Sequence, residues 1–205
     1  MKTRDRILIT SLELFNTYGE PNVTTLQIAD TLDISPGNLY YHFKNKSEII
    51  NELFGQFEKR MIELLDVPPG TTITLEDHWL FLHLLFELIA EYRFIYRDLV
   101  NILQRYDRLN THFRRILNRK LDTTKTLLAS LKAQDILQAS QEEMEALCHN
   151  LVLTITYWSS FDILFKQPGD DVDLARGVYH VVAQVAPYLR DAERQEVEAL
   201  GRQYL

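Results

Sequence analysis

Cysteine is nearly absent from this sequence, since Cys148 is the only one among 205 residues. A single cysteine excludes an internal disulfide framework and a cysteine-based zinc site. Glycine and proline are missing altogether from residues 71–167. A β-rich segment of that length would need turn residues throughout, whereas a set of long helices would not. The sequence therefore predicts an all-α protein.

Long apolar runs are also missing. No stretch approaches the roughly 18 consecutive apolar residues of a membrane-spanning helix, and the first residues lack the apolar core of a secretory signal. We therefore expect a cytoplasmic protein without a membrane partner. The net charge of −7 argues against a protein coated in basic surface, such as a histone-like binder.

Catalytic motifs are absent as well. The sequence contains no His-Glu-x-x-His, no Glu-x-x-His pair, no glycine-rich phosphate loop and no Gly-x-Ser-x-Gly elbow. Cys148 lies within an apolar helical run, where a thiol is inert. The sequence therefore predicts no enzyme, no metal site and no cofactor.

What the chain does contain is helical periodicity, with apolar residues recurring at intervals of three and four. Helix starts are marked too, because Thr24 and Gln27 have the spacing of a capping box and Ser35 precedes Pro36 as an N-cap. Breaks are expected around 66–70 and 168–170. These patterns predict nine to ten helices, at 3–18, 25–32, 36–43, 46–65, 75–91, 93–105, 108–133, 142–166 and 172–188, with a polar final helix near 191–203.

Residues 24–43 predict a short helix, a three-residue turn at 32–34 and a second short helix, which is helix-turn-helix geometry. In that motif the second helix enters the major groove of DNA. Apolar residues supply a small core: Ile28, Leu32, Ile34, Leu39 and Phe43. The other positions of the second helix are expected to face outward: Pro36, Gly37, Asn38, Tyr40, Tyr41 and His42.

One longer motif covers this whole segment: Thr24-Thr25-x-x-Ile28-Ala29, then Leu32-x-Ile34-Ser35-x-Gly37-x-Leu39-Tyr40-Tyr41-His42-Phe43-Lys44-Asn45-Lys46. It resembles the DNA-binding segment of TetR-type bacterial transcriptional regulators, and the resemblance spans residues 4–54. It implies a three-helix DNA-binding domain at 1–46 and a larger helical effector-binding and dimerisation domain at 47–205. The implied function is a transcriptional regulator, usually a repressor, that binds double-stranded operator DNA as a homodimer.

The resemblance also implies a role for the outward residues. The residues implied to contact DNA bases are Ser35, Gly37, Asn38 and Tyr40. Those implied to contact the DNA backbone are Thr24, Thr25, Tyr41, His42 and Lys46. Arg4, Pro36 and Lys44 complete the predicted DNA-binding set. Residues 1–50 hold five Lys/Arg against six Asp/Glu, so few phosphates are neutralised per subunit and useful affinity is expected to depend on dimerisation.

The larger domain is expected to bind an unidentified small-molecule effector among its aromatic side chains. Polar groups on the same apolar runs are either satisfied core residues or the orienting groups of the pocket, and the sequence leaves both interpretations open. The predicted pocket residues are Trp79, His83, Phe86, Phe94, Phe113, Asn150, Thr154, Tyr157, Trp158 and Phe161.

A basic stretch suggests the chemistry of that effector. Residues 93–125 contain nine Lys/Arg against three Asp/Glu, and Arg108, Arg115 and Arg119 share one helical face. A solvated helix face is the default interpretation of this pattern. The sharper hypothesis is an anionic effector, such as an acyl-CoA or a fatty acid, whose head group meets this face.

The dimer surface is expected to be an apolar face of the helices at 142–166 and 172–188. Its predicted members are Leu147, Leu151, Ile155, Val178, Val181, Val182, Val185 and Leu189. The effector is expected to tilt helix 46–65 and so change the spacing of the two recognition helices. The competing hypothesis is a helical ligand-binding or adaptor protein without sequence-specific DNA binding, which the acidic balance leaves room for.

Overall fold

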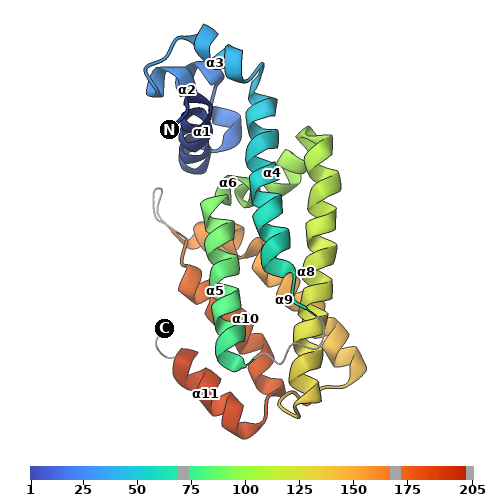
Figure 1. The fold of residues 1–205 in the computed structure, drawn as a ribbon. Coiled ribbons are helices and arrows are strands. Elements are labelled where there is room, and N and C mark those ends of the chain that lie inside the picture. Colours follow the sequence, from blue (N-terminus) through green and yellow to red (C-terminus); the bar gives the residue numbers. More distant parts are fainter. Residues whose placement is uncertain (69–73, 167–171, 202–205) are drawn as a thin grey trace. The chain divides into compact units, whose positions relative to one another are not determined.

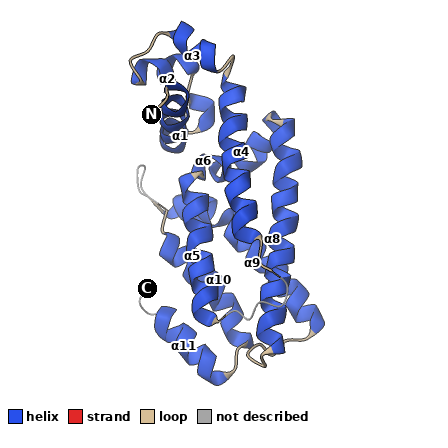
Figure 2. Ribbon diagram, viewed as in Figure 1, coloured by secondary structure: helices blue, strands red, loops and turns tan. Residues whose placement is uncertain are grey.

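The computed structural model describes residues 1–68, 74–166 and 172–201, whose course is traced in Figure 1. Within these ranges the chain forms helices joined by short loops and contains no β strand (Figure 2), so the predicted all-α class is confirmed. The α-helices are α1 (Thr3–Tyr18), α2 (Thr25–Thr31), α3 (Pro36–His42), α4 (Lys46–Leu65), α5 (Leu75–Glu91), α6 (Arg93–Arg97), α7 (Leu99–Arg105), α8 (Asp107–Ala133), α9 (Gln141–Asp162), α10 (Leu174–Val185) and α11 (Asp191–Gly201).

Most helices begin and end within a few residues of their predicted bounds. The predicted helix at 93–105 is instead two, α6 and α7, because the backbone leaves the helical region at Asp98 (φ −135°, ψ 44°). The last turns after α9 and α10 are short 3₁₀ helices, η2 (Ile163–Phe165) and η3 (Ala186–Tyr188). Positions 69–70 and 168–170 of the predicted breaks lie outside the described residues.

The helix starts of the predicted helix-turn-helix are capped as the sequence indicates. The hydroxyl of Thr24 accepts a hydrogen bond from the backbone N–H of Gln27 (3.1 Å), and that of Ser35 accepts from the N–H of Asn38 (3.2 Å). The turn between α2 and α3 passes through Asp33, whose φ of 53° lies in the left-handed region that aspartate enters more readily than most residues. These local interactions fix where α3 begins.

The chain divides into two compact units. Unit 1 comprises residues 1–60 and 92–113, and unit 2 comprises residues 61–91 and 114–205 within the described ranges. The sequence predicted a division at residue 46 instead. The difference arises because α6 packs on α1, where the backbone N–H of Phe94 donates to Asn16 Oδ1 (3.0 Å) and the Phe94 ring lies 5.5 Å from that of Phe15.

Aromatic rings fill the core of unit 1. The ring of Tyr96 lies 5.9 Å from Phe57 and 5.8 Å from Phe113, and all three side chains are fully buried. Phe94 is buried in the same unit. Phe94 and Phe113 were predicted to line an effector pocket, but the structure places both in this core, because α6 and the start of α8 belong to unit 1.

In unit 2, α10 packs against both α5 and α9. The close approach depends on Gly177, because a Cβ atom there would lie 2.6 Å from Cδ1 of Trp158 and 2.8 Å from Cε1 of Phe86. Trp158 and Phe86 belong to the same unit as Gly177.

Replacing Gly177 with alanine is expected to destabilise unit 2 by about 1–3 kcal/mol, because the added methyl group overlaps two rings. Gly55 is the matched control: it lies within α4, and a Cβ there meets nothing within 4 Å. Alanine at Gly55 is expected to be neutral or stabilising by up to about 1 kcal/mol. Urea unfolding is followed by tryptophan fluorescence for unit 2, which holds Trp79, Trp158 and Gly177, and by far-UV circular dichroism for unit 1, which holds Gly55. Equal unfolding free energies for the two variants contradict the close approach.

Candidate nucleic-acid interface and effector cavity

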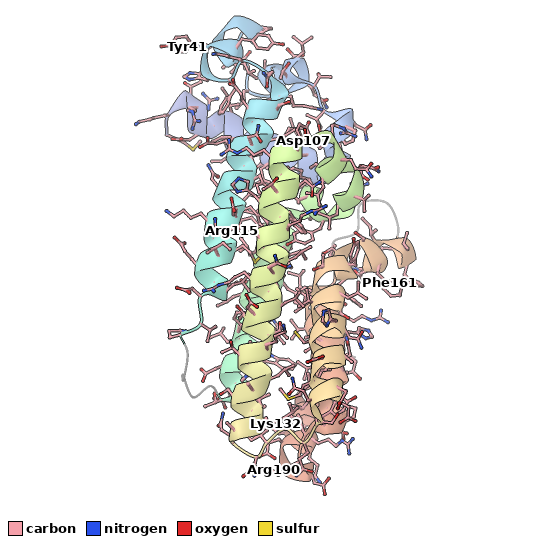
Figure 3. All side chains as sticks on the ribbon, turned by 90° about the vertical axis from the view of Figure 1, so that its right-hand side faces the viewer. Tyr41, Asp107, Arg115, Lys132, Phe161 and Arg190 are labelled. Atoms are coloured by element: carbon pink, nitrogen blue, oxygen red, sulfur yellow. The ribbon has the colours of Figure 1, made fainter. Side chains whose placement is uncertain are left out.

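The outward face of α3 is exposed as predicted. Tyr41 is 85% exposed and projects from the ribbon in Figure 3. Pro36, Gly37, Asn38 and Tyr40 are also exposed, and His42 is half-buried. Beneath them Leu39 is fully buried in the small helix-turn-helix core. A row of polar and aromatic groups therefore stands on a rigid, capped helix.

Tyr40 ties the recognition face to the start of α2. Its hydroxyl lies 2.9 Å from the hydroxyl of Thr25, within hydrogen-bonding distance. A shallow hollow opens beside this contact, and its lining includes Thr24, Thr25, Tyr40 and Lys44. Hydroxyls and an exposed cation in one hollow are the groups that contact phosphate oxygens in protein–DNA complexes.

Two of the predicted phosphate-binding cations are engaged inside unit 1. The ammonium group of Lys46 donates to the backbone carbonyls of Glu20 (2.9 Å) and Val23 (3.0 Å) and pairs with the Glu20 carboxylate (2.8 Å). These contacts use all three N–H groups of the lysine. Arg4 pairs with Glu52 (3.1 Å), and its guanidinium lies 4.8 Å from the centre of the Phe43 ring. Both side chains therefore hold the framework of the motif together.

A buried carboxylate that the sequence did not indicate lies at the centre of this framework. Glu20, only 3% exposed, accepts a hydrogen bond from the hydroxyl of Tyr106 (2.9 Å) and pairs with Lys46 and Arg105. Burial, together with the hydrogen bond to Glu20, raises the pKa of the Tyr106 hydroxyl far above its usual range. Glu20 thus joins the segment after α1 to the start of α4 and to the junction of α7 and α8.

Unit 2 contains an apolar cavity of about 90 Å³. Residues from α5, α8, α9, α10 and α11 line it, together with Leu189 from the loop before α11: Leu75, His78, Trp79, Phe81, Leu82, Thr124, Leu127, Leu128, Leu131, Leu151, Ile155, Val181, Val182, Val185, Leu189, Glu196 and Val197. Of the ten predicted pocket residues, only Trp79 is among them.

The other predicted pocket residues of unit 2 lie elsewhere. Phe86 is fully buried in the core, and Trp158 stacks on His180 with ring centres 4.7 Å apart. The hydroxyl of Thr154 accepts from the Gln184 amide (2.9 Å), and the His83 ring lies 5.6 Å from that of Trp79. Asn150, Tyr157 and Phe161 are exposed. The predicted pocket set is therefore divided between the two units and between buried and exposed positions.

Most of the predicted dimer residues are buried in the single chain. Leu147, Leu151, Ile155, Val178, Val181 and Leu189 are buried, and Val182 and Val185 are half-buried. Most of the set lines the cavity.

Another stripe of α9, at four-residue spacing, is exposed instead: Leu153 (58%), Tyr157 (41%) and Phe161 (55%), the last labelled in Figure 3. Leu164 and Phe165 of η2 extend it with large exposed side chains.

The basic stretch at 93–125 does not form one charged face. Lys120 is buried, and burial lowers the pKa of its ammonium group to about 7. Arg105 pairs with Glu20 and Arg119 pairs with Asp66. Arg108 and Arg115 are exposed on α8. None of these side chains is among the residues that line the cavity of unit 2.

No group of three or more His, Cys, Asp or Glu side chains in the described ranges is arranged to hold a metal ion. Across residues 1–68, 74–166 and 172–201, no helix is both long enough and apolar enough to cross a membrane.

Comparison with known proteins identifies the family. A family model described as bacterial transcriptional repressor, TetR, matches residues 56–197, and one described as bacterial regulatory proteins, tetR family, matches residues 7–53. Among solved structures, a TetR-family transcriptional regulator from Marinobacter aquaeolei VT8 is 41% identical to this chain with a TM-score of 0.89. That match covers 100% of this chain and 99% of the other.

Curated relatives match over shorter segments. Tetracycline repressor protein class C of Escherichia coli is 38% identical over 50 residues, which are 24% of this chain and 23% of that protein. The transcriptional regulator QacR of Staphylococcus aureus is 38% identical over 63 residues, 31% of this chain and 34% of its own. Across the first curated relatives the match spans about a quarter to half of their length. The matched proteins are DNA-binding regulators and not enzymes, and the chain belongs to the TetR family of bacterial transcriptional regulators.

Proposed function

We propose that this TetR-family protein is a repressor that binds a palindromic operator as a homodimer and is released from it by a small molecule in the cavity of unit 2. The observation that carries the proposal is the outward face of α3, where exposed Asn38, Tyr40 and Tyr41 stand on a helix with a capped start. Helix-turn-helix proteins present such a face to the major groove.

Within this proposal the start of α3 reads bases and its surroundings contact phosphates. Asn38 is an exposed amide at the third position of α3, suited to a bidentate contact with adenine. The Thr25–Tyr40 hydrogen bond orients Tyr40, and Thr24, Tyr41 and Lys44 flank it as phosphate contacts. The contacts of Arg4 and Lys46 give these two residues a framework role.

The test is binding to a labelled duplex from the region upstream of the protein's own gene, with a scrambled duplex of equal length as competitor. Specific binding that falls steeply as salt rises is the expected result. Alanine in place of Asn38 is expected to cost about 1–3 kcal/mol at one base position and to relax the preference there. Equal affinity for the two duplexes supports instead a helical adaptor without sequence-specific DNA binding.

The two lysines that flank the hollow are expected to respond differently to alanine. Replacing exposed Lys44 should reduce the salt dependence of DNA binding by about 0.9 per subunit, the slope for one phosphate contact. Replacing Lys46 should leave the slope unchanged and lower the stability of unit 1 by about 2 kcal/mol, because a charged group with three hydrogen bonds is lost. Anisotropy titrations over a range of salt and urea unfolding measure the two effects. If replacing Lys46 reduces the salt dependence of DNA binding and replacing Lys44 does not, these roles are contradicted.

Dimerisation is supported by the exposed stripe of α9. Leu153, Tyr157 and Phe161 lie on one helical face at four-residue spacing, and monomeric proteins seldom expose a contiguous row of large apolar groups. We propose a second copy of this chain as the occupant, because one helix-turn-helix contacts only half of a palindromic site. Of the residues first predicted for the dimer surface, six are buried in the single chain, and Val182 and Val185 are half-buried.

The effector is proposed to act through helices that belong to both units. α4 and α8 each have residues in unit 1 and in unit 2, so they connect the cavity-bearing unit to the DNA-binding one along the chain. A ligand shifts the protein between two states only by its differential affinity for them. The basic stretch at 93–125 led to the prediction of an anionic lipid as the effector. The lining of the cavity, which includes no lysine or arginine among the described residues, favours an uncharged ligand instead.

A further inference from the structure

The cavity of unit 2 offers little to a charged ligand. Its polar lining residues are His78, Thr124 and Glu196, and no lysine or arginine is among the residues that line it in the described part of the chain. A carboxylate or phosphate placed there loses its hydration without gaining a cation, and Glu196 repels it. The lining therefore disfavours the anionic head group that the basic stretch suggested.

His78 lines the cavity, and one hydrogen bond fixes which nitrogen of its imidazole carries the proton. Nδ1 lies 2.7 Å from the backbone carbonyl oxygen of Thr74, and a carbonyl oxygen only accepts, so Nδ1 carries the proton and donates it. In the neutral ring Nε2 is then an acceptor. Nε2 is buried and has no hydrogen-bond partner within the described residues. A buried acceptor without a partner costs stability until a donor reaches it.

The start of α5 holds this arrangement in place. The hydroxyl and the backbone N–H of Thr74 donate to Asp77 Oδ2 (2.7 Å and 2.9 Å), and the N–H of Asp77 donates back to the Thr74 hydroxyl (3.1 Å). This capping box holds Thr74 in position, and with it the backbone carbonyl that accepts the hydrogen bond from His78. The imidazole is thus anchored on Nδ1, and its buried Nε2 is an acceptor without a partner among the described residues.

We propose that the cavity binds an uncharged hydrophobic molecule that carries one hydrogen-bond donor, a phenol or an alcohol, and that this donor bonds to Nε2 of His78. The apolar walls from five helices enclose the body of the ligand, and His78 orients it. The inference rests on the proposed function, since it names the chemical class of the effector. The cavity of about 90 Å³ is smaller than the roughly 150 Å³ of a cavity that takes up benzene, so small single-ring molecules are the appropriate first probes and the walls must yield slightly to admit them.

Three matched probes test the class of ligand by calorimetric titration of the full chain: 4-ethylphenol, ethylbenzene and 4-ethylbenzoate. The phenol is expected to bind about three- to tenfold more tightly than ethylbenzene, the difference made by one net hydrogen bond. The benzoate is expected to show no saturable binding. Saturable binding of the benzoate overturns the proposal in favour of an anionic effector.

Variants of the protein identify the side chain that accepts the hydrogen bond from the ligand. His78→Phe keeps a ring and removes the acceptor, so the preference for phenol over ethylbenzene should disappear while ethylbenzene still binds. His149→Phe is the matched control, because His149 makes the same kind of hydrogen bond to the carbonyl of Glu145 (2.8 Å) but is exposed and does not line the cavity. Val185→Phe, which fills the cavity, should abolish binding of every probe.

Operator binding, measured on the same preparations, separates this inference from the proposed function. Equal affinity for phenol and ethylbenzene, or a phenol preference that survives in His78→Phe, overturns the donor inference and leaves the repressor intact. No binding of any probe by a protein that still binds its operator also overturns it. A protein that shows the phenol preference but binds no operator contradicts the proposed function alone.

Discussion

Replacing Glu20 with alanine is expected to lower the unfolding free energy of unit 1 by about 3 kcal/mol, as removal of one partner from a buried ion pair does. Glu20 is almost fully buried and is the common partner of Lys46, Arg105 and Tyr106. Its loss leaves two cations and a hydroxyl without their acceptor. Lys46 and Arg105 are partly exposed and regain some hydration, so we expect the lower end of the range for buried pairs.

Two optical signals distinguish the affected unit. Far-UV circular dichroism follows the helices of both units, whereas tryptophan fluorescence follows only unit 2, which contains Trp79 and Trp158. In the Glu20→Ala protein the dichroism transition should begin at a lower urea concentration than the fluorescence transition. Such non-coincident transitions mean that the two units no longer unfold together.

Two further variants serve as controls for Glu20. Glu13→Ala removes an exposed carboxylate of α1 and should leave both transitions unchanged within about 0.5 kcal/mol. Glu20→Gln keeps one acceptor and should fall between the two alanine variants. An unchanged dichroism curve for Glu20→Ala would show that the buried carboxylate does not hold the elements of unit 1 together.

The helix-turn-helix was predictable from sequence because each of its features depends on near neighbours. Thr24 and Ser35 cap helices that begin one residue later, and the caps form as predicted. The exposure of Tyr41 follows from its position relative to Leu39 and Phe43, which point inward. Local spacing was sufficient for this part of the molecule.

The faces of the longer helices were not predictable in the same way. On α9, Leu151 and Ile155 have the same four-residue spacing as Leu153 and Tyr157, yet the first pair is buried and the second is exposed. Periodicity shows that a helix has apolar stripes and does not say which stripe its neighbours cover. The predicted dimer residues therefore lie on stripes that are largely buried in the single chain, and of the predicted pocket residues Trp79 lines the cavity.

The contacts of Glu20 could not be predicted from spacing at all. Its partners Arg105 and Tyr106 lie 85 and 86 positions along the chain, and only the packing of α6 on α1 brings their segment near. The same packing moved residues 92–113 from the predicted effector domain into unit 1. Sequence shows the charges of such residues, whereas tertiary contacts decide which of them pair.

Glutamate in place of both Leu153 and Phe161 is expected to convert the protein to a monomer and to weaken operator binding by about a thousandfold. Two charges per subunit on the proposed interface would be desolvated and would repel their copies in the partner. A monomer contacts one half-site, and its affinity should fall toward that of non-specific binding, which is typically at least 10³-fold weaker. Because both side chains are exposed in the single chain, folding should be little affected.

The matched control is glutamate in place of both Leu80 and Leu84, which are also exposed in unit 2 but lie on α5. Leu80 is 59% exposed and Leu153 58%, so the two double variants make similar changes on different helices. Sedimentation velocity gives the oligomeric state, and anisotropy titration gives the operator affinity. If the α5 variant dissociates and the α9 variant stays dimeric, the interface is on another face. The α9 variant could instead be monomeric and still bind the operator as tightly as the unmodified protein. In that case dimerisation does not supply the affinity, and the two half-sites are not bound by a preformed dimer.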